Sequence, residues 1–224
     1  MKQKRFDFDV AVIGGGSGGY AAARTAAAAG LKTVVIEGGR EVGGLCILRG
    51  CMPTKALLYA AEVKHLAEHA KTWGVQAGKV SFNFPNVMAR KAGQIKDFAD
   101  FREQQLRDGR FQFIRANARF VDEHTAELSW ERRHPAGEFS DEKTPAGSRR
   151  SRRLTAKYFI ISTGSRVAPP PLPQLNDVGF ITSDDAVSLK KLPKSLILLG
   201  GGAIACEFAQ FFTRFGVKVT LIQR

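Results

Sequence analysis

The sequence predicts an α/β protein in which two strand–turn–helix–strand units lie along a chain of 224 residues. Two glycine-rich turns, at residues 14–19 and 200–205, each come directly after a short apolar run. Each turn leads into a run with helical character, which a single glycine ends, and then into a second apolar run. Buried parallel strands read as continuous apolar runs joined by helices, so this order favours a parallel sheet.

The first unit opens with a predicted buried strand at 9–13. The turn after it fits Gly-x-Gly-x-x-Gly, an Ala-rich helix follows at 20–29, and a strand at 33–36 ends beside Glu37. Glycines let the backbone approach a pyrophosphate, whose charge a helix N-terminus favours. A carboxylate about 20 residues past the glycines accepts hydrogen bonds from a ribose hydroxyl. The unit is therefore predicted to bind a dinucleotide, and a tight turn without a ligand is the alternative. The candidate residues of this turn are Gly14, Gly16, Ser17 and Gly19.

The second unit repeats this order near the end of the chain. A strand at 195–199 precedes a turn that fits Gly-x-Gly-x-x-Ala, and a helix then runs to Gly216 before a strand at 217–222. Two such units predict two bound nucleotides, and a flavin dinucleotide is a candidate for one of them. Residues 158–165 form a predicted strand that ends in a small polar turn. The candidate residues of the second glycine turn are Gly200, Gly202, Ala203, Ile204 and Ala205.

Two cysteines, Cys46 and Cys51, follow the first unit with four residues between them. A regular helix rises about 1.5 Å per residue, which would separate them by roughly 7–8 Å along its axis. A disulfide requires Cα atoms within about 7 Å of each other. The two cysteines can therefore form a disulfide only if the backbone departs from an ideal helix, and Gly50 permits this departure. A dithiol loop beside a dinucleotide site suggests electron transfer to or from sulfur.

With these motifs in place, the sequence resembles the N-terminal half of the class I pyridine nucleotide–disulfide oxidoreductases. This group includes dihydrolipoyl dehydrogenase, glutathione reductase and mercuric reductase. The resemblance follows the chain order of the first glycine turn, Glu37, the C-x₄-C-x-P-x-K segment, Ile-Ser-Thr-Gly-Ser and the second turn as far as Glu207. It implies a Rossmann-like FAD-binding domain at 1–168, with a redox-active disulfide, and the start of a second Rossmann-like domain, which binds NAD(P), at 169–224.

The resemblance also implies roles for single residues. Cys46 would attack the substrate, and Cys51 would lie against the isoalloxazine ring of the flavin. Lys55 would lie near the flavin, with Glu207 as a candidate partner. The residues implied to line FAD are those of segment 37–46, which includes Glu37, Gly38, Gly44, Leu45 and Cys46, together with Ala118, Ser162, Thr163 and Gly164. The residues implied to line the nicotinamide nucleotide run from Gly200 to Glu207, and Arg224 joins them.

Three features depart from the usual pattern of the family. Leu45 stands where members usually have Thr, and Gln223 stands where the second unit usually has an acidic residue. Because Gln223 is neutral and Arg224 can hold a phosphate bidentately, we expect NADPH to be preferred over NADH. The chain also stops at Arg224, before the interface domain whose histidine serves the partner subunit in this family. We therefore expect a homodimer in the full-length form and a fragment that is inactive alone.

The implied function is that of a FAD-dependent oxidoreductase that passes electrons between NAD(P)H, FAD and a Cys46–Cys51 disulfide, most like dihydrolipoyl dehydrogenase. A small-molecule disulfide or dithiol is the implied substrate. Two alternatives stay open: a mercuric reductase-like enzyme, and an inactive nucleotide-binding remnant that lacks the interface domain.

Composition agrees with a cytoplasmic α/β protein. Three cysteines are too few for a secreted disulfide scaffold, and no apolar run is long enough to span a membrane. The formal charge of +13 raises the alternative of a nucleic-acid partner. Much of the excess flanks the Pro-, Gly- and Ser-rich stretch 134–148, where a solvated loop is the simpler interpretation. No aromatic residues are interleaved with these charges, so nucleic acid is not expected as a partner. The flanking residues are Arg132, Arg133, Arg149, Arg150, Arg152 and Arg153.

Two further helices are predicted, at 54–72 and at 85–108. The first contains His65 and His69 in the pattern H-x-x-E-H, which raises the alternative of a shared metal ion. No third ligand is evident, so two polar residues on a solvent face are the simpler interpretation, and no metal site is expected. Cys206 is predicted to be a small buried residue and not a redox partner.

Overall fold

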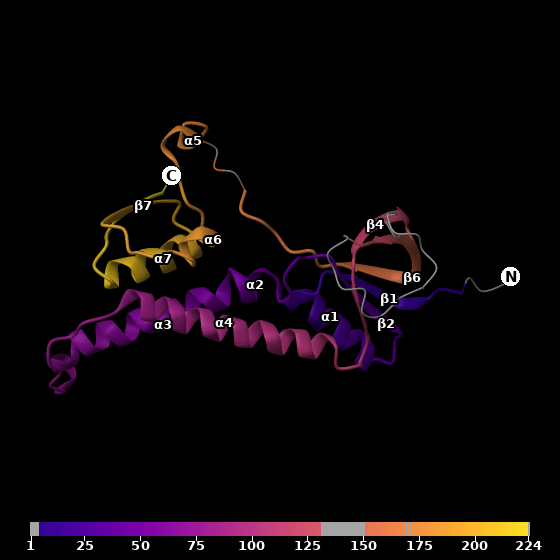
Figure 1. The fold of residues 1–224 in the computed structure, drawn as a ribbon, viewed down its shortest axis with the longest axis horizontal. Coiled ribbons are helices and arrows are strands. Elements are labelled where there is room, and N and C mark those ends of the chain that lie inside the picture. The colour runs from indigo at the N-terminus through magenta and orange to yellow at the C-terminus, as the bar shows by residue number, and fades with distance from the viewer. Residues whose placement is uncertain (1–4, 131–150, 169, 171, 224) are drawn as a thin grey trace. The chain divides into compact units, whose positions relative to one another are not determined.

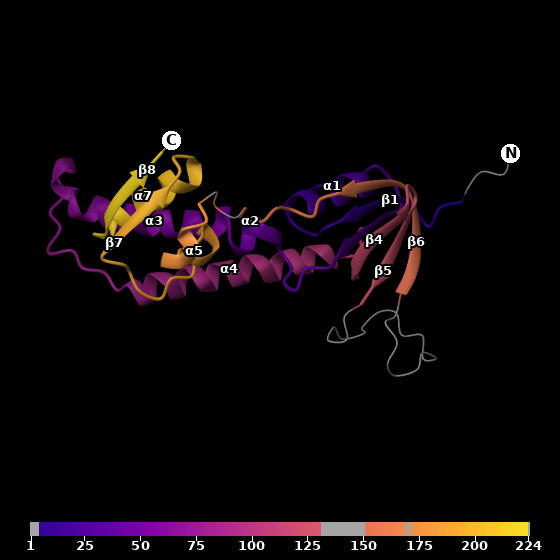
Figure 2. The same cartoon turned by 90° about the horizontal axis from the view of Figure 1, so that it is seen from above.

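The computed structural model describes residues 5–130, 151–168, 170 and 172–223. The chain divides into two compact units, whose elements Figures 1 and 2 show from two directions. The first unit comprises Met1–Leu45 and Ala99–Ser165, and the second comprises Cys46–Phe98 and Arg166–Arg224. The predicted division into domains at residue 168 stays a prediction.

The first unit is built on a six-stranded sheet with the order β3-β2-β1-β6-β5-β4. Strand β1 pairs in parallel with β2 and β6, and β2 pairs in parallel with β3. Strands β4, β5 and the first half of β6 form an antiparallel meander. The strands are β1 Phe8–Ile13, β2 Thr33–Glu37, β3 Gln112–Arg115, β4 Asn117–Asp122, β5 Thr125–Ser129 and β6 Ser151–Ile161.

Both faces of the parallel strands are covered, which is why β1 and β2 read as continuous apolar runs. Helix α1, Ser17–Ala28, packs Tyr20 and Ala23 against Val12 and Val35. The opposite face of the same strands joins a second cluster with the meander. The α/β class and the first strand–turn–helix–strand unit are confirmed. The helix begins three residues before the predicted start, because its first turn accommodates two glycines.

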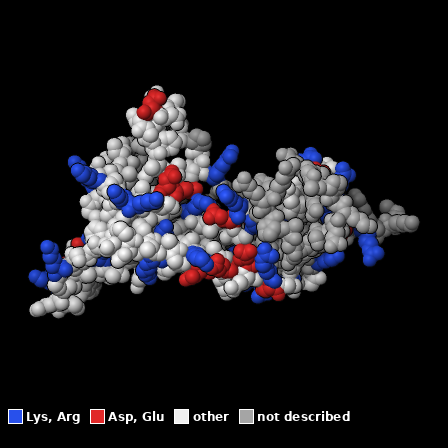
Figure 3. All heavy atoms as spheres, in the orientation of Figure 1, with Lys and Arg blue, Asp and Glu red and all other residues white. Residues whose placement is uncertain are grey.

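Strand β6 is longer than predicted. Its second half, from Ala156 to Ile161, pairs with β1, whereas its first half pairs with β5. Because Arg152 and Arg153 are basic and exposed, the first half of the strand is not an apolar run. The other four arginines that flank the 134–148 stretch, and the stretch itself, lie outside the described residues. On the face seen in Figure 3, the described basic side chains are interspersed with acidic ones.

The second unit contains the second predicted strand–turn–helix–strand unit, which the structure confirms. Strands β7 and β8 pair in parallel, and α7 connects them. Its core joins Phe208, Phe211 and Phe212 of α7 to Leu57 and Ala61 of α3. The elements are α3 Cys51–Glu68, the 3₁₀ helix η1 Ala70–Trp73, α4 Phe84–Leu106, α5 Leu175–Val178, α6 Ser183–Ala186, β7 Ser195–Leu199, α7 Ala203–Arg214 and β8 Lys218–Ile222.

The two long predicted helices are present with shifted ends. The first begins at Cys51 and is replaced after Glu68 by η1, so the predicted range of 54–72 is only partly α-helical. The second, α4, belongs to the second unit up to Phe98 and to the first unit beyond it. No helix in the described part of the chain is long and apolar enough to cross a membrane.

Candidate functional site

The first glycine turn lies between β1 and α1 and leaves no room for a side chain at Gly14 or at Gly19. Gly14 has a φ of +106°, in the region that favours glycine, and its N–H donates to Ile36 O at 2.8 Å. A Cβ at Gly14 would lie 2.3 Å from Ser162 O, and a Cβ at Gly19 would lie 1.8 Å from Gly14 O. The N-cap residue Gly16 makes no side-chain capping hydrogen bond. The amides of the first turn of α1 are therefore free of a side-chain cap and are suited to an anion.

Glu37 connects this turn to the loop that follows β2. Its Oε2 accepts from Gly15 N–H at 2.7 Å, and its Oε1 accepts from Gly39 N–H at 2.5 Å. Each carboxylate oxygen can accept two hydrogen bonds, so Glu37 keeps acceptor capacity for the hydroxyls of a ribose. Its carboxylate lies beside the glycine turn, as the sequence predicted.

Of the other residues implied to line FAD in the first unit, Gly44 and Ser162 border the same turn. A Cβ at Gly44 would lie 2.7 Å from Gly16 Cα, and a Cβ at Gly18 would lie 2.9 Å from Ser162 Oγ. Ser162 follows β6 directly, and its N–H donates to Ile13 O at 2.8 Å. Ala118 is half-buried on β4, next to Asn117. A Cβ at Gly38 would meet the Oδ1 of that asparagine at 2.4 Å. This close backbone cradle, with a carboxylate at its edge, fits the pyrophosphate and ribose of FAD.

The two cysteines lie on either side of a break between helices. Helix α2, Gly44–Leu48, ends before Gly50, and α3 begins at Cys51. Gly50 has φ −114° and ψ −118°, which is not helical, so the predicted departure from an ideal helix is confirmed. Cys46 is half-buried, Cys51 is exposed, and both are free thiols in the structure. The disulfide therefore stays a prediction.

The environment of Cys51 affects its protonation. A hydrogen bond to Cys46 is the largest of the effects that raise the pKa of Cys51 above its ordinary value, and the charge of Cys46 is the next. The positive charge of Lys55 acts in the opposite direction and lowers the pKa of Cys51. The two thiols thus lie close enough to influence each other's chemistry, which two isolated cysteines would not do.

Lys55 and Glu207 form an ion pair across 152 residues of sequence. Lys55 lies in the first turns of α3, and Glu207 lies in the first turns of α7. The predicted pairing is confirmed. A second pair, Glu62 with Arg214, joins the same two helices closer to their other ends. The side chains of Lys55 and Glu207 are 59% and 31% exposed, so solvent screens the ion pair and it contributes little to the stability of the fold.

The second glycine turn repeats the geometry of the first. Gly200 has a φ of +110°, and its N–H donates to Ile222 O at 2.8 Å. Gln223 follows Gly200 by 23 residues, the spacing that separates Glu37 from Gly14. A Cβ at Gly201 would lie 2.8 Å from Gln223 Oε1, so the glutamine lies where the first unit has Glu37. Arg224, the other residue in the cofactor prediction, lies outside the described residues.

The prediction that Cys206 is buried is wrong. Cys206 is exposed, and its thiol donates to Gly201 O at 3.6 Å. The buried face of α7 contains Phe208, Phe211 and Phe212, and Cys206 lies about 200° around the helix from Phe208. The prediction rested on a small residue within an apolar run, but helix geometry places Cys206 on the face opposite the buried phenylalanines.

His65 and His69 lie side by side on α3, with ring centroids 4.2 Å apart. The Nδ1 of His69 lies 2.8 Å from His65 O. Among the residues that the structure describes, no group of three or more His, Cys, Asp or Glu side chains could share a metal ion.

Sequence analysis missed one residue beside the first glycine site. Arg115, the last residue of β3, donates from Nη2 to Gly39 O at 2.5 Å and to Arg40 O at 3.3 Å. The available signal was its position three residues before Ala118, which the resemblance assigns to the FAD site. A single charged residue at the end of an apolar strand belongs to no repeating pattern, so the sequence alone does not indicate which residues it contacts.

Comparison with known proteins agrees with this geometry. The profile of the family described as "Pyridine nucleotide-disulphide oxidoreductase" matches residues 8–224. The chain belongs to this family. Its members are flavoprotein oxidoreductases that bind FAD and use NAD(P)H.

Several relatives match almost the whole chain. A dihydrolipoyl dehydrogenase of Chlorobaculum tepidum is 40% identical over 218 residues, which are 96% of this chain and 42% of the relative. The dihydrolipoyl dehydrogenase of Bacillus subtilis is 36% identical over 97% of this chain and 44% of its own length. A mercuric reductase of Bacillus cereus is 31% identical over 98% of this chain and 31% of its own length. The chain thus spans less than half the length of these relatives.

A solved structure also resembles the chain. It is a Cu(II) complex of a mutant of the HOCl-induced flavoprotein disulfide reductase RclA from Escherichia coli. The TM-score is 0.74 and the sequence identity 26%, over 98% of this chain and 43% of that one.

Proposed function

We propose that this chain is the electron-transfer part of a FAD-dependent disulfide oxidoreductase, most like dihydrolipoyl dehydrogenase. Electrons would pass between NAD(P)H, FAD and a disulfide of Cys46 and Cys51. The observation that carries the proposal is the non-helical break at Gly50, on either side of which Cys46 and Cys51 lie as free thiols. The break supplies the departure from an ideal helix that a disulfide between the two cysteines requires.

The first unit would hold the adenosine diphosphate part of FAD. Backbone N–H groups at the start of α1 would donate to the pyrophosphate, and Glu37 would accept from the ribose. Bound FAD would take a hydride from a reduced nicotinamide and supply an electron pair to sulfur. Ala118 and the segment 162–164 would also line FAD.

The two thiols would divide the substrate chemistry between them. The thiolate of Cys46 attacks one sulfur of a small-molecule disulfide, forms a mixed disulfide and releases the first substrate thiol. The thiolate of Cys51 then attacks Sγ of Cys46, releases the second substrate thiol and leaves the Cys46–Cys51 disulfide. Return to the dithiol takes two electrons and two protons. In the dihydrolipoyl direction the same steps run in reverse.

Lys55 supports the second of these steps. The hydrogen bond to Cys46 and the charge of Cys46 raise the pKa of Cys51 overall, and the positive charge of Lys55 offsets part of that rise and so favours the thiolate that must attack. The ion pair with Glu207 holds the Lys55 ammonium on α3 while the charge of the thiol changes. In this proposal Lys55 also lies near the flavin, as the resemblance implies.

For the nicotinamide cofactor we propose NADPH. Gln223 takes the place of the carboxylate that would bind a ribose 2′-hydroxyl and repel a 2′-phosphate. Arg224 would hold that phosphate. We further propose a cytoplasmic homodimer in the full-length form, in which the partner subunit supplies the acid–base histidine.

A second candidate is reduction of a soft metal ion, as in a mercuric reductase. Two adjacent thiols suit such an ion as substrate, and relatives of this chain include mercuric reductases. An inactive nucleotide-binding remnant is the third candidate.

The test uses the 224-residue chain reconstituted with FAD without oxygen after mild oxidation. NADPH should expose two new thiols per bound FAD, which mass spectrometry after alkylation should locate at Cys46 and Cys51. Cys46→Ser and Cys51→Ser should expose none, while Cys206→Ser should behave as the wild type. NADH should react more slowly than NADPH. We expect weak FAD binding and no turnover with lipoamide or glutathione disulfide, because the 224 residues span less than half the length of the relatives. Exposure of no thiols would support the remnant.

A further inference from the structure

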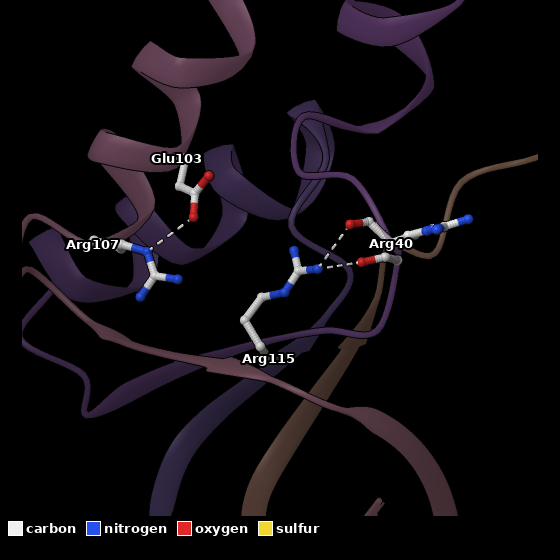
Figure 4. Close-up of polar contacts among 5 residues, drawn as sticks. Arg40, Glu103, Arg107 and Arg115 are labelled. Atoms are coloured by element: carbon white, nitrogen blue, oxygen red, sulfur yellow. Dashed lines mark hydrogen bonds and ion pairs between the residues drawn. The ribbon is translucent and has the colours of Figure 1, made fainter. Parts of the chain in front are cut away.

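The loop after β2 is held from two sides at a single residue, Gly39. The carboxylate of Glu37 accepts from its N–H at 2.5 Å, and the guanidinium of Arg115 donates to its carbonyl at 2.5 Å. Arg115 also reaches Arg40 O at 3.3 Å, as Figure 4 shows. An acidic and a basic side chain therefore fix the Gly39 residue at its donor and at its acceptor. Hydrogen bonds to charged groups are the strong ones, so the loop has little freedom here.

The sheet explains why these two side chains meet. Glu37 and Arg115 are opposite each other in the parallel pair of β2 and β3, which places both side chains on one face. The N–H of Ala116 donates to Glu37 O at 3.1 Å and continues the pairing beyond β3. The neighbouring Arg107 is engaged elsewhere, since its Nε donates to Glu103 Oε1 at 3.2 Å (Figure 4). The strand register thus places the Arg115 side chain beside the loop that follows β2.

This arrangement carries a local cost. Nη1 of Arg115 is buried and has no hydrogen-bond partner among the residues that the structure describes. A buried donor without an acceptor destabilises a fold. A shorter or apolar residue at this position would avoid that cost, so the contacts of Nη2 are the feature that favours arginine. Those contacts act on the Glu37 carboxylate through Gly39.

We infer that Arg115 is a positioning residue for the ribose of a bound adenine nucleotide. By fixing Gly39 it holds the Glu37 carboxylate between Gly39 N–H and Gly15 N–H, in the orientation from which it accepts from a ribose hydroxyl. Arg115 itself does not touch the ligand. The inference rests on the proposed function, because it assumes that the first unit binds the adenosine diphosphate part of FAD.

The experiment compares ADP with 2′-deoxy-ADP, which lacks the hydroxyl that Glu37 would accept. Affinities of both are measured by calorimetry for the 224-residue chain and for Arg115→Met, Arg115→Lys and Arg119→Met. The wild type should bind ADP about tenfold more tightly than 2′-deoxy-ADP, the ratio expected for one hydrogen bond to a charged group. Arg115→Met should bind both alike. Arg115→Lys keeps a donor and should keep part of the preference.

Arg119→Met is the matched control. Arg119 lies on β4, the next strand along the chain, where its guanidinium pairs with Glu127 at 2.7 Å. This variant should keep the full preference for ADP. A purely structural role of Arg115 would weaken both ligands equally and leave their ratio unchanged, which would overturn the inference. If the wild type binds neither ADP nor FAD, the proposed function itself fails.

Discussion

Replacing Gly14 with alanine should destabilise the first unit by about 2–5 kcal/mol, because two separate effects add at this residue. The first is backbone strain: a φ of +106° costs a residue with a Cβ roughly 1–2 kcal/mol. The second is steric, since the new Cβ would lie 2.3 Å from the backbone oxygen of Ser162 and 2.7 Å from its carbonyl carbon. Neither atom can swing aside as a side chain would. The backbone at Gly14, directly after β1, and at Ser162, directly after β6, must therefore move apart, at a cost of about 1–3 kcal/mol.

Gly30 provides the control within the same unit. It also has a positive φ, of +78°, but a Cβ there would meet nothing within 4 Å. Gly30→Ala should therefore show only the strain, about 1–2 kcal/mol. Urea unfolding can be followed through Trp130 fluorescence in a Trp73→Phe background, because the chain has two tryptophans and Trp130 is the one in the first unit. Equal losses of stability for the two substitutions would refute the steric argument.

Two further predictions concern protonation. Cys46→Ala, in a Cys206→Ser background, should shift the pH profile of Cys51 alkylation by iodoacetamide to lower pH, because the hydrogen bond to Cys46 is the main cause of the raised pKa of Cys51; an unchanged profile would contradict this. Hydrogen bonds from the backbone and side chain of Thr182 lower the pKa of Asp185 in the folded protein below its ordinary value of 3.8. The ionised carboxylate therefore stabilises the second unit at any pH above 3.8. This stabilisation is lost as the pH falls through the lower pKa of the folded state. Acidification below about pH 4 should therefore destabilise the wild type more steeply than Asp185→Asn, as followed by Trp73 fluorescence in a Trp130→Phe background; parallel slopes would rule out this role for Asp185.

Local features of the site were predictable from the sequence. The glycine turn at 14–19 needs positive φ and close backbone contact at fixed positions, which only glycine tolerates, so its pattern is visible in the residues themselves. The interruption between Cys46 and Cys51 follows from chain geometry within six residues. Glu37 has a fixed place because a strand of defined length ends there. In each case the cause lies within about one turn or one strand of the residue concerned.

Tertiary structure decided what depends on distant parts of the chain. The exposure of Cys206 follows from which face of α7 the phenylalanines bury, and the extent of β6 follows from its pairing with both β1 and β5. The role of Arg115 depends on its register opposite Glu37, 78 residues earlier in the sequence. Register is a property of two strands together, and neither strand encodes it in its own pattern. For this protein the sequence alone determined the turns, the helix break and the acidic strand end, whereas the assembled sheet decided which side chains act on one another.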